Sequence, residues 1–151
     1  MSKVLVGVDA SQGSVEALRR AAEVARWRDY TLEVVYAYPP NEELSAFPVP
    51  PPQHDRAGEL KKANETLGTW LDQLDLDLSD LEVRWHVVAN RKPARALIER
   101  SAEAELVVVG SRGIGGFRGL LLGSTSEQVV HHAMCSVLVA RRSTQVPEES
   151  A

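Results

Sequence analysis

The residues best suited to chemistry lie in one glycine-rich segment, residues 110–127, which holds six of the protein's ten glycines. The segment carries Arg112 and Arg118, and its only acid is its last residue, Glu127, in a chain with 21 acids. Glycines let a ligand approach the backbone closely, so several N–H groups can point at one anion. A helix is expected from Ser124, and its free N–H groups and positive dipole end favour an anion too. The segment therefore predicts a phosphate-binding loop.

Two common phosphate motifs do not fit this segment. No lysine follows its glycines, which excludes the P-loop pattern G-x-x-x-x-G-K-[ST]. The dinucleotide fingerprint G-x-G-x-x-G begins at Gly113 and Gly115 but has Arg118 at its third glycine. The sequence thus excludes both a P-loop and a nicotinamide site of that type.

Several candidate residues have a purely structural alternative. Ser124 and Glu127 have the spacing of a capping box, which satisfies the first N–H groups of a helix without a ligand. Asp9 follows an apolar run and can cap the next helix, an alternative that stays open. His131 and His132 have no acid or nucleophile paired with them in the sequence, so we expect surface or packing roles.

The elements that must position these residues follow from the apolar pattern. Helical stripes with apolar residues every three or four positions begin at Val15, at Leu60 and after Pro93, and a fourth helix is expected near Ser124. The second stripe continues to Leu78. Short apolar runs rich in β-branched residues predict five strands: Lys3 to Val8, Leu32 to Tyr38, Val83 to Val88, Leu106 to Val109 and Val137 to Ala140. This alternation predicts the α/β class, a doubly wound, Rossmann-like or flavodoxin-like sheet of five mainly parallel strands with helices on both faces. The tryptophans are expected to pack in the core or at helix edges: Trp27, Trp70 and Trp85.

Composition limits the class of protein. A chain of 151 residues with 44% hydrophobic residues can support one core, and its single cysteine, Cys135, excludes an internal disulfide. The formal net charge of −4 argues against a nucleic-acid surface. The sequence lacks the apolar run of about 18 residues that a membrane span needs, and Met1 to Val8 lack the long apolar stretch expected of a signal peptide. We therefore expect a cytoplasmic protein.

One domain is expected over residues 1–142. Within it, residues 39–55 predict a surface loop, since Tyr38 to Gln53 holds six of the eight prolines. The polar tail, residues 143–151, has no apolar periodicity and is expected to be disordered.

The spacing of Gly110, Gly113, Gly123 and Ser124 fits G-x2-G-x9-G-[ST] and resembles the nucleotide signature of the ATP-binding universal stress proteins. The opening, Val4 to Ser11, resembles that family's first strand and its Asp-containing turn. With the closing strand, the resemblance covers residues 3–142.

The resemblance implies a site for ATP, with Mg²⁺ beside the phosphates. It places Gly7, Val8 and Asp9 against the adenosine and the backbone of Ala37 at the adenine edge. Val109 and Gly110 would flank the ribose and the first phosphate, and the triphosphate would be surrounded by Arg112, Gly113, Gly123, Ser124, Thr125 and Ser126. The chain departs from the family at Tyr36, where a histidine is common, and not at the spaced glycines.

The function implied by the resemblance is that of a nucleotide-responsive regulatory module in the stress response. A slow ATPase or phosphotransferase and an interaction dimer with a vestigial pocket stay open as alternatives. The sequence offers no convincing base and no loop lysine, so any hydrolysis should be slow, about 10⁻⁴ to 10⁻³ per second. The family also implies a homodimer through the last strand, Val137 to Arg141, whose exposed backbone edge a second copy would cover.

Overall fold

The computed structural model describes residues 1–39, 56–90, 92–111 and 122–141. The helices and strands alternate along the chain, as the apolar pattern predicted: β1 (Lys3–Val8), α1 (Gln12–Arg28), β2 (Thr31–Tyr38), α2 (Arg56–Asp72), β3 (Val83–Ala89), α3 (Pro93–Ser101), β4 (Leu106–Gly110), α4 (Ser124–His132) and β5 (Ser136–Ala140). The predicted proline-rich loop and tail fall almost wholly outside the described residues. Among the described residues, no helix combines the length and apolarity needed to cross a bilayer.

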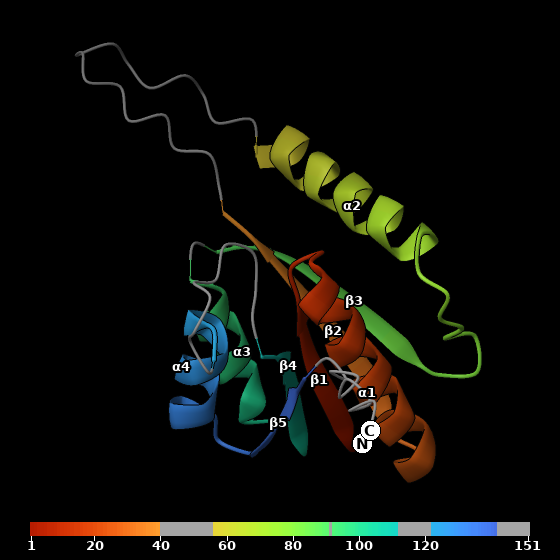
Figure 1. Cartoon of the computed structure of the whole chain (residues 1–151). Coiled ribbons are helices and arrows are strands. Elements are labelled where there is room, and N and C mark those ends of the chain that lie inside the picture. The colour runs from red at the N-terminus through yellow and green to blue at the C-terminus, as the bar shows by residue number, and fades with distance from the viewer. Residues whose placement is uncertain (40–55, 91, 112–121, 142–151) are drawn as a thin grey trace, which may run out of the picture.

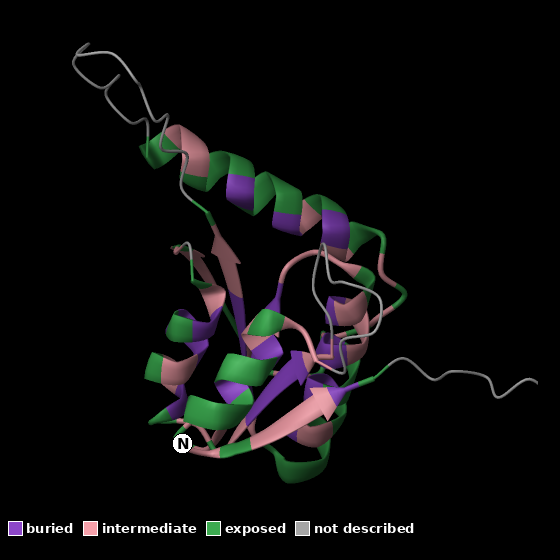
Figure 2. Cartoon of the chain, turned by 60° about the vertical axis from the view of Figure 1, so that its left-hand side comes forward, coloured by how far each residue is buried: buried purple, intermediate pink, exposed green. Residues whose placement is uncertain are grey.

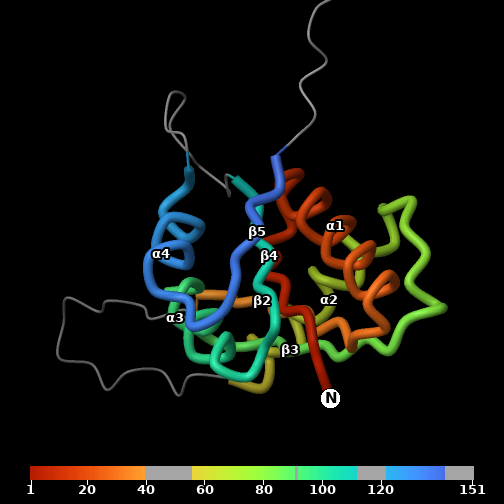
Figure 3. Tube along the Cα trace, turned by 90° about the horizontal axis from the view of Figure 1, so that it is seen from below, coloured from red at the N-terminus to blue at the C-terminus, as the bar shows by residue number. Residues whose placement is uncertain are grey.

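The five strands form one sheet in the order β3-β2-β1-β4-β5, and every neighbouring pair is parallel. Helices α1 and α2 cover one face of the sheet, and α3 and α4 cover the other (Figures 1 and 3). The chain first winds outward from β1 to β3 and then crosses to β4. The winding therefore reverses between β1 and β4, and sheets of this kind hold their ligands at the carboxyl ends of the strands beside such a reversal.

Alternation along the central strands divides the core between the two faces. Val4 and Val6 of β1 are completely buried on the α1 side, whereas Leu5 packs on the α3 side. Figure 2 shows this burial along the strands, with exposed residues on the outer surfaces of the helices. The central strands are apolar on both faces because helices cover both faces. This rigid centre fixes where the strand ends lie.

One charged residue breaks the apolar pattern of the sheet. Glu33 of β2 is buried, and its carboxylate lies 3.2 Å from the Lys3 ammonium and 3.6 Å from Nε2 of His86. The three residues come from the adjacent strands β1, β2 and β3. A carboxylate is tolerated here because a cation on the neighbouring strand offsets the cost of removing it from water.

The second helix is shorter than its sequence pattern predicted. It ends at Asp72, and the prediction that its stripe continues to Leu78 is wrong. Leu74, Leu76 and Leu78 instead follow in an irregular segment and pack partly buried against the core on the α1 side. Their spacing of two residues suits an extended chain, in which alternate side chains share a face.

Two further predictions change in the structure. Trp27 is 81% exposed, so it is not a packing residue; α1 buries the opposite side of the helix, and the Arg28 guanidinium lies 5.2 Å from the indole centroid. Trp85 is also exposed, and only Trp70 is buried as predicted. In the acidic segment after α2, Asp80 accepts hydrogen bonds of 2.5 and 2.8 Å from the Arg26 guanidinium of α1.

Candidate functional site

The end of β4 and the start of α4 are tied together at the carboxyl edge of the sheet. The glycine-rich segment leaves the described structure after Ser111 and returns at Leu122, and the N–H of Gly123 donates to the carbonyl of Ser111 at 2.6 Å. The hydroxyl of Ser126, which is buried, donates to the carbonyl of Gly110. These two bonds fix the first turn of α4 beside the last residue of β4.

The first turn of α4 has no side-chain cap. Gly123 is the N-cap residue, and the first bond within the helix runs from the N–H of Glu127 to the Gly123 carbonyl at 2.9 Å. Among the described residues, no acceptor bonds the N–H groups of Ser124, Thr125 and Ser126. The capping-box interpretation is therefore wrong, and α4 presents three donors and the positive end of its dipole.

The turn between β1 and α1 is held by the side chain of Asp9. Its Oδ1 accepts hydrogen bonds from the Ser11 N–H at 2.9 Å and from the Ser14 hydroxyl at 2.5 Å. The N–H of Asp9 donates to the same Ser14 hydroxyl at 2.8 Å. Between them Ala10 adopts a left-handed conformation with φ of 62°, which non-glycine residues rarely take. Ser11 is the N-cap residue of α1 but makes no side-chain cap bond. Asp9 thus has a structural role in holding the turn, but it is not the cap that the alternative interpretation expected, because the N-cap residue of α1 is Ser11.

Helix α1 approaches the end of β4 so closely that Gly110 leaves no room for a side chain. A Cβ atom at Gly110 would lie 2.8 Å from the carbonyl oxygen of Gly13, in the first turn of α1. A Cβ atom at Gly7 would lie 2.6 Å from a methyl group of Leu97 in α3. Gly110 is therefore required by packing against backbone atoms, whatever ligand it meets, whereas the contact at Gly7 is with a side chain that can move. The two glycines bring the helices close to the strand ends at the point of reversal.

The end of β2 extends past the end of β1. The last residue of β1 paired with β2 is Val8, opposite Tyr36, whereas β2 and β3 stay paired through Tyr38. The carbonyl of Tyr38 accepts from the Asn90 N–H at 2.9 Å, which points the Tyr38 backbone toward β3. Backbone groups alternate in direction along a strand, so the backbone of Ala37 faces the β1 side. That is the direction from which an adenine edge could reach it.

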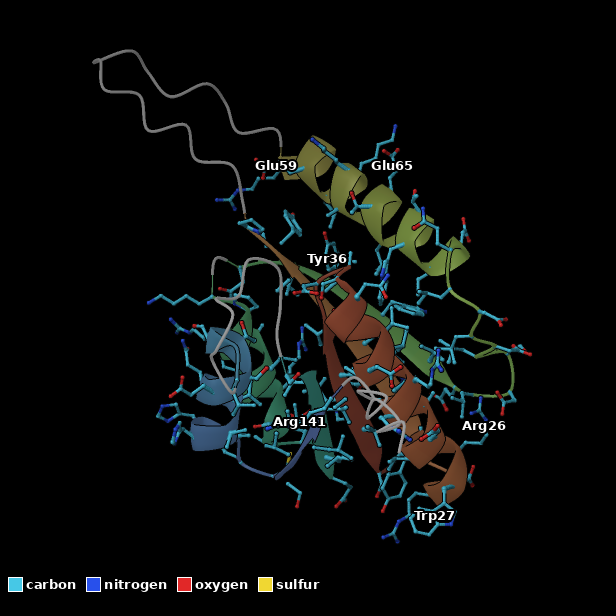
Figure 4. The ribbon with its side chains drawn as sticks, viewed as in Figure 1. Arg26, Trp27, Tyr36, Glu59, Glu65 and Arg141 are labelled. Atoms are coloured by element: carbon cyan, nitrogen blue, oxygen red, sulfur yellow. The ribbon has the colours of Figure 1, made fainter. Side chains whose placement is uncertain are left out.

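Tyr36 lies at this end of the sheet, where α1 begins, and Trp27 lies at the opposite end of α1 (Figure 4). Burial raises the pKa of the Tyr36 phenol, and the nearby Asp9 carboxylate raises it further. The phenol is therefore neutral at physiological pH and is available as a hydrogen-bond donor. Tyr36 therefore places a polar atom close to Asp9.

The described site residues lie at the carboxyl ends of β1, β2 and β4 and at the start of α4, although the structure limits what some of them can offer. The side chains of Val8 and Val109 are buried in the core, so only their backbones can face a ligand. The Ser126 hydroxyl already bonds the end of β4. Two predicted residues lie outside the described residues: Arg112 and Gly113. In the described part of the chain, no three His, Cys, Asp or Glu side chains gather as metal ligands.

Sequence reasoning missed Ser14 as a member of the site. Its hydroxyl bonds Asp9 at both the backbone N–H and the carboxylate. The signal that could have found it is a small polar residue five positions after Asp9, on the first turn of a helix. Such a residue can reach back to the turn that precedes its helix.

Comparison with known proteins identifies the family. Residues 1–141 match the universal stress protein family. This chain belongs to the universal stress protein family. The universal stress protein Rv2005c of Mycobacterium tuberculosis is 42% identical over 142 residues, which is 93% of this chain and 45% of that protein. The chain thus spans about half the length of this relative.

Solved universal stress proteins share the fold. UspA of Lactobacillus plantarum is similar with a TM-score of 0.74 and 22% identity, over 93% of this chain and 97% of that one. A universal stress protein solved in complex with cAMP has a TM-score of 0.58 and 27% identity, over 93% of this chain and 96% of that one. The five-stranded parallel sheet of this universal stress protein is therefore the fold of its structural neighbours.

Proposed function

We propose that this universal stress protein binds an adenine nucleotide, ATP with Mg²⁺, at the carboxyl ends of β1 and β4 and acts as a nucleotide-responsive regulatory module in the stress response. The observation that carries this proposal is the uncapped first turn of α4, whose three unbonded N–H groups lie beside the end of β4 in the described part of the chain. A helix start of this kind binds phosphate through its donors and its dipole. The neighbour solved with cAMP supports the adenine nucleotide as the class of ligand.

Each predicted residue has a role in this proposal. The backbone of Gly123 to Ser126 would hold the phosphates, completed by Arg112 and Gly113 from the glycine-rich segment. Asp9 would meet the adenosine beside Gly7 and Val8, Ala37 would meet the base edge, and Val109 and Gly110 would flank the ribose and the first phosphate. A bound Mg²⁺ would supply positive charge to the phosphate oxygens.

The donors of α4 can supply much of a useful affinity. A hydrogen bond to a charged oxygen contributes about 1.5 to 3 kcal/mol, so three contribute about 4.5 to 9 kcal/mol. Micromolar binding corresponds to about 8 kcal/mol, and association itself has a cost. The contacts to the adenosine are therefore needed as well, which is why the proposal requires the ends of β1 and β2 in addition to α4.

Identifying the nucleotide that the protein carries tests the proposal directly. Freshly purified protein is denatured, and released small molecules are identified by mass spectrometry. ATP or ADP near one per chain supports the regulatory module, and steady phosphate release on incubation with ATP favours the slow ATPase. No nucleotide, together with no heat on titration with ATP and Mg²⁺, favours the interaction dimer with a vestigial pocket.

A variant of the loop gives a second test. Gly123 has φ of −70° and ψ of 161°, a conformation that valine also adopts, so Gly123→Val should fold. We expect it to abolish ATP binding, because the added side chain stands at the start of α4. The matched control is Gly68→Val, at a position in α2 where a Cβ atom has open space. Undiminished affinity in folded Gly123→Val would overturn the assignment of the loop.

We also propose a homodimer through β5. Among the described residues β5 pairs only with β4, at one edge of the sheet, and none of its five residues is charged. Exposed edges usually carry charges that discourage pairing, and the next charged residue is Arg141, after the strand. Antiparallel pairing with a second copy would satisfy the free backbone groups. Sedimentation at micromolar concentration should give a dimer, and a monomer would contradict this proposal.

A further inference from the structure

Ser14 occupies an unusual position for a polar side chain. It lies in the first turn of α1 and is only 5% exposed. Its hydroxyl accepts from the Asp9 N–H at 2.8 Å and donates to the Asp9 carboxylate at 2.5 Å. A single buried oxygen therefore bonds both the backbone and the side chain of Asp9, the residue that follows β1 at the point of reversal.

The turn that Ser14 holds is strained and needs support. Ala10 has φ of 62°, a conformation that costs an alanine about 1 kcal/mol or more. The bond from the Ser11 N–H to Asp9 Oδ1, at 2.9 Å, closes the turn around Ala10. This bond exists only while the Asp9 carboxylate keeps its present rotamer. The Ser14 hydroxyl and the Ser11 N–H both donate to Oδ1 and together favour that rotamer.

The first turn of α1, which contains Ser14, is held in place by close packing. Gly13, the neighbour of Ser14, lies against Gly110 so closely that no Cβ atom fits between them. The first turn of α1 is thus packed on the end of β4, and this packing fixes the position of Ser14, which belongs to the same turn. The position of the Asp9 carboxylate is therefore set relative to β4 and α4, where the proposed phosphate donors lie.

We propose that Ser14 is a positioning residue, which holds the Asp9 carboxylate for the adenosine without contacting the nucleotide itself. This inference rests on the proposed nucleotide-binding function. A carboxylate already fixed in one rotamer loses little conformational freedom when a ligand binds, so preorganisation raises affinity. Removal of the Ser14 hydroxyl takes away one of the hydrogen bonds that hold the carboxylate, and we expect the resulting loss of affinity to act through Asp9.

A double-mutant cycle separates this role from a general structural one. ATP affinity is measured by calorimetry for the wild type, Ser14→Ala, Asp9→Ala and the double variant. We expect Ser14→Ala to weaken binding about tenfold in the wild type, as expected for loss of one charge-assisted hydrogen bond. In the Asp9→Ala background the same change should have no effect. Equal losses in both backgrounds would overturn the proposal.

Two matched variants cover the case in which Ser14→Ala does not fold. Ser14→Thr and Ser14→Val have the same shape and differ in the hydroxyl, so any cost of the extra methyl groups is common to both. We expect Ser14→Thr to bind ATP more tightly than Ser14→Val by about tenfold. Equal affinity of the two variants would overturn the positioning role.

Amide hydrogen exchange tests the same role without a ligand. In the wild type, the N–H of Ser11 is protected by its bond to Asp9 Oδ1. The Ser14 variants that lack the hydroxyl should lose this protection, while Ser14→Thr should keep it. Unchanged protection of Ser11 in Ser14→Val would show that the carboxylate stays in place without Ser14. If the wild type binds no adenine nucleotide, the proposed function fails, and the exchange result still decides whether Ser14 positions Asp9.

Discussion

The contact between Gly110 and Gly13 gives a sharp prediction about stability. In Gly110→Ala the new Cβ atom would lie 2.8 Å from the carbonyl oxygen and 3.1 Å from the carbonyl carbon of Gly13. Both are backbone atoms of α1, so relief requires movement of the helix against β4. Overpacking of a well-packed site costs about 1 to 3 kcal/mol, and we expect the upper end of that range here because no side chain can rotate away.

Two other glycines provide controls for this substitution. Gly68 lies in α2, where an added Cβ atom would have nothing within 4 Å, so Gly68→Ala should stabilise the protein by about 1 kcal/mol through helix propensity. At Gly7 the crowding atom is a methyl group of Leu97, 2.6 Å away, and that side chain can rotate. We therefore expect Gly7→Ala to cost about 1 kcal/mol, at the lower end of the overpacking range.

Thermal unfolding followed by circular dichroism, without nucleotide, measures all three variants. For a chain of this length, 1 kcal/mol corresponds to about 2 to 4 °C in Tm. We expect Gly110→Ala to lower Tm by about 6 to 12 °C and Gly68→Ala to raise it by about 2 to 4 °C. A Gly110→Ala protein as stable as the wild type would refute the packing argument. Ligand binding would then be the reason left for a glycine at this position.

Three further predictions concern single positions. Asp29, at the end of α1, has φ of 57°, and its carboxylate opposes the helix dipole, so Asp29→Gly should raise the unfolding free energy by about 1 kcal/mol in urea titration. Glu33→Ala should lower it by about 3 kcal/mol, since Lys3 and His86 would lose a buried partner, while Glu33→Gln should cost less in the same titration. The hydrogen bond from Arg26 lowers the pKa of Asp80 below its ordinary value of 3.8. In the Arg26→Ala variant, NMR titration should therefore show the Asp80 pKa rising toward that value. Because the pKa of Asp80 is lowered in the folded state, the Arg26–Asp80 pair stabilises the fold at pH values above the ordinary pKa. This stabilisation is lost as the pH falls through the lowered pKa of the folded state. An Asp80 pKa that does not change in Arg26→Ala would contradict the pairing.

Most of the architecture could be predicted from the sequence because its signals are local. The runs of β-branched residues in β1 and β4 and the three-to-four spacing in α1 each depend on neighbours within one element. The prediction for α2 was wrong at its end, since leucines beyond Asp72 continue an apolar pattern that a helix and an extended segment both fit. Trp27 was misassigned for a related reason: residue type alone does not say which side of a helix faces the core.

The candidate site likewise has a part that could be predicted from the sequence and a part that could not. The spaced glycines and Asp9 could be found from sequence, and the structure gathers the described ones at one edge of the sheet. The capping box could not be decided from sequence, because Ser124 and Glu127 have the right spacing whether or not the bonds form. In the structure Gly123 precedes the helix instead, and the hydroxyl of Ser126 turns to β4.

The sequence by itself determined the alternation of strands and helices, the parallel sheet and the family to which the chain belongs. Only the tertiary structure decided that Ser14 holds Asp9, that Lys3 neutralises Glu33 across two strands, and that Gly110 has no side chain because Gly13 lies against it. The physical reason is distance along the chain. Periodicity and propensity report on residues a few positions apart, whereas these contacts join elements that meet only when the sheet and its helices have packed.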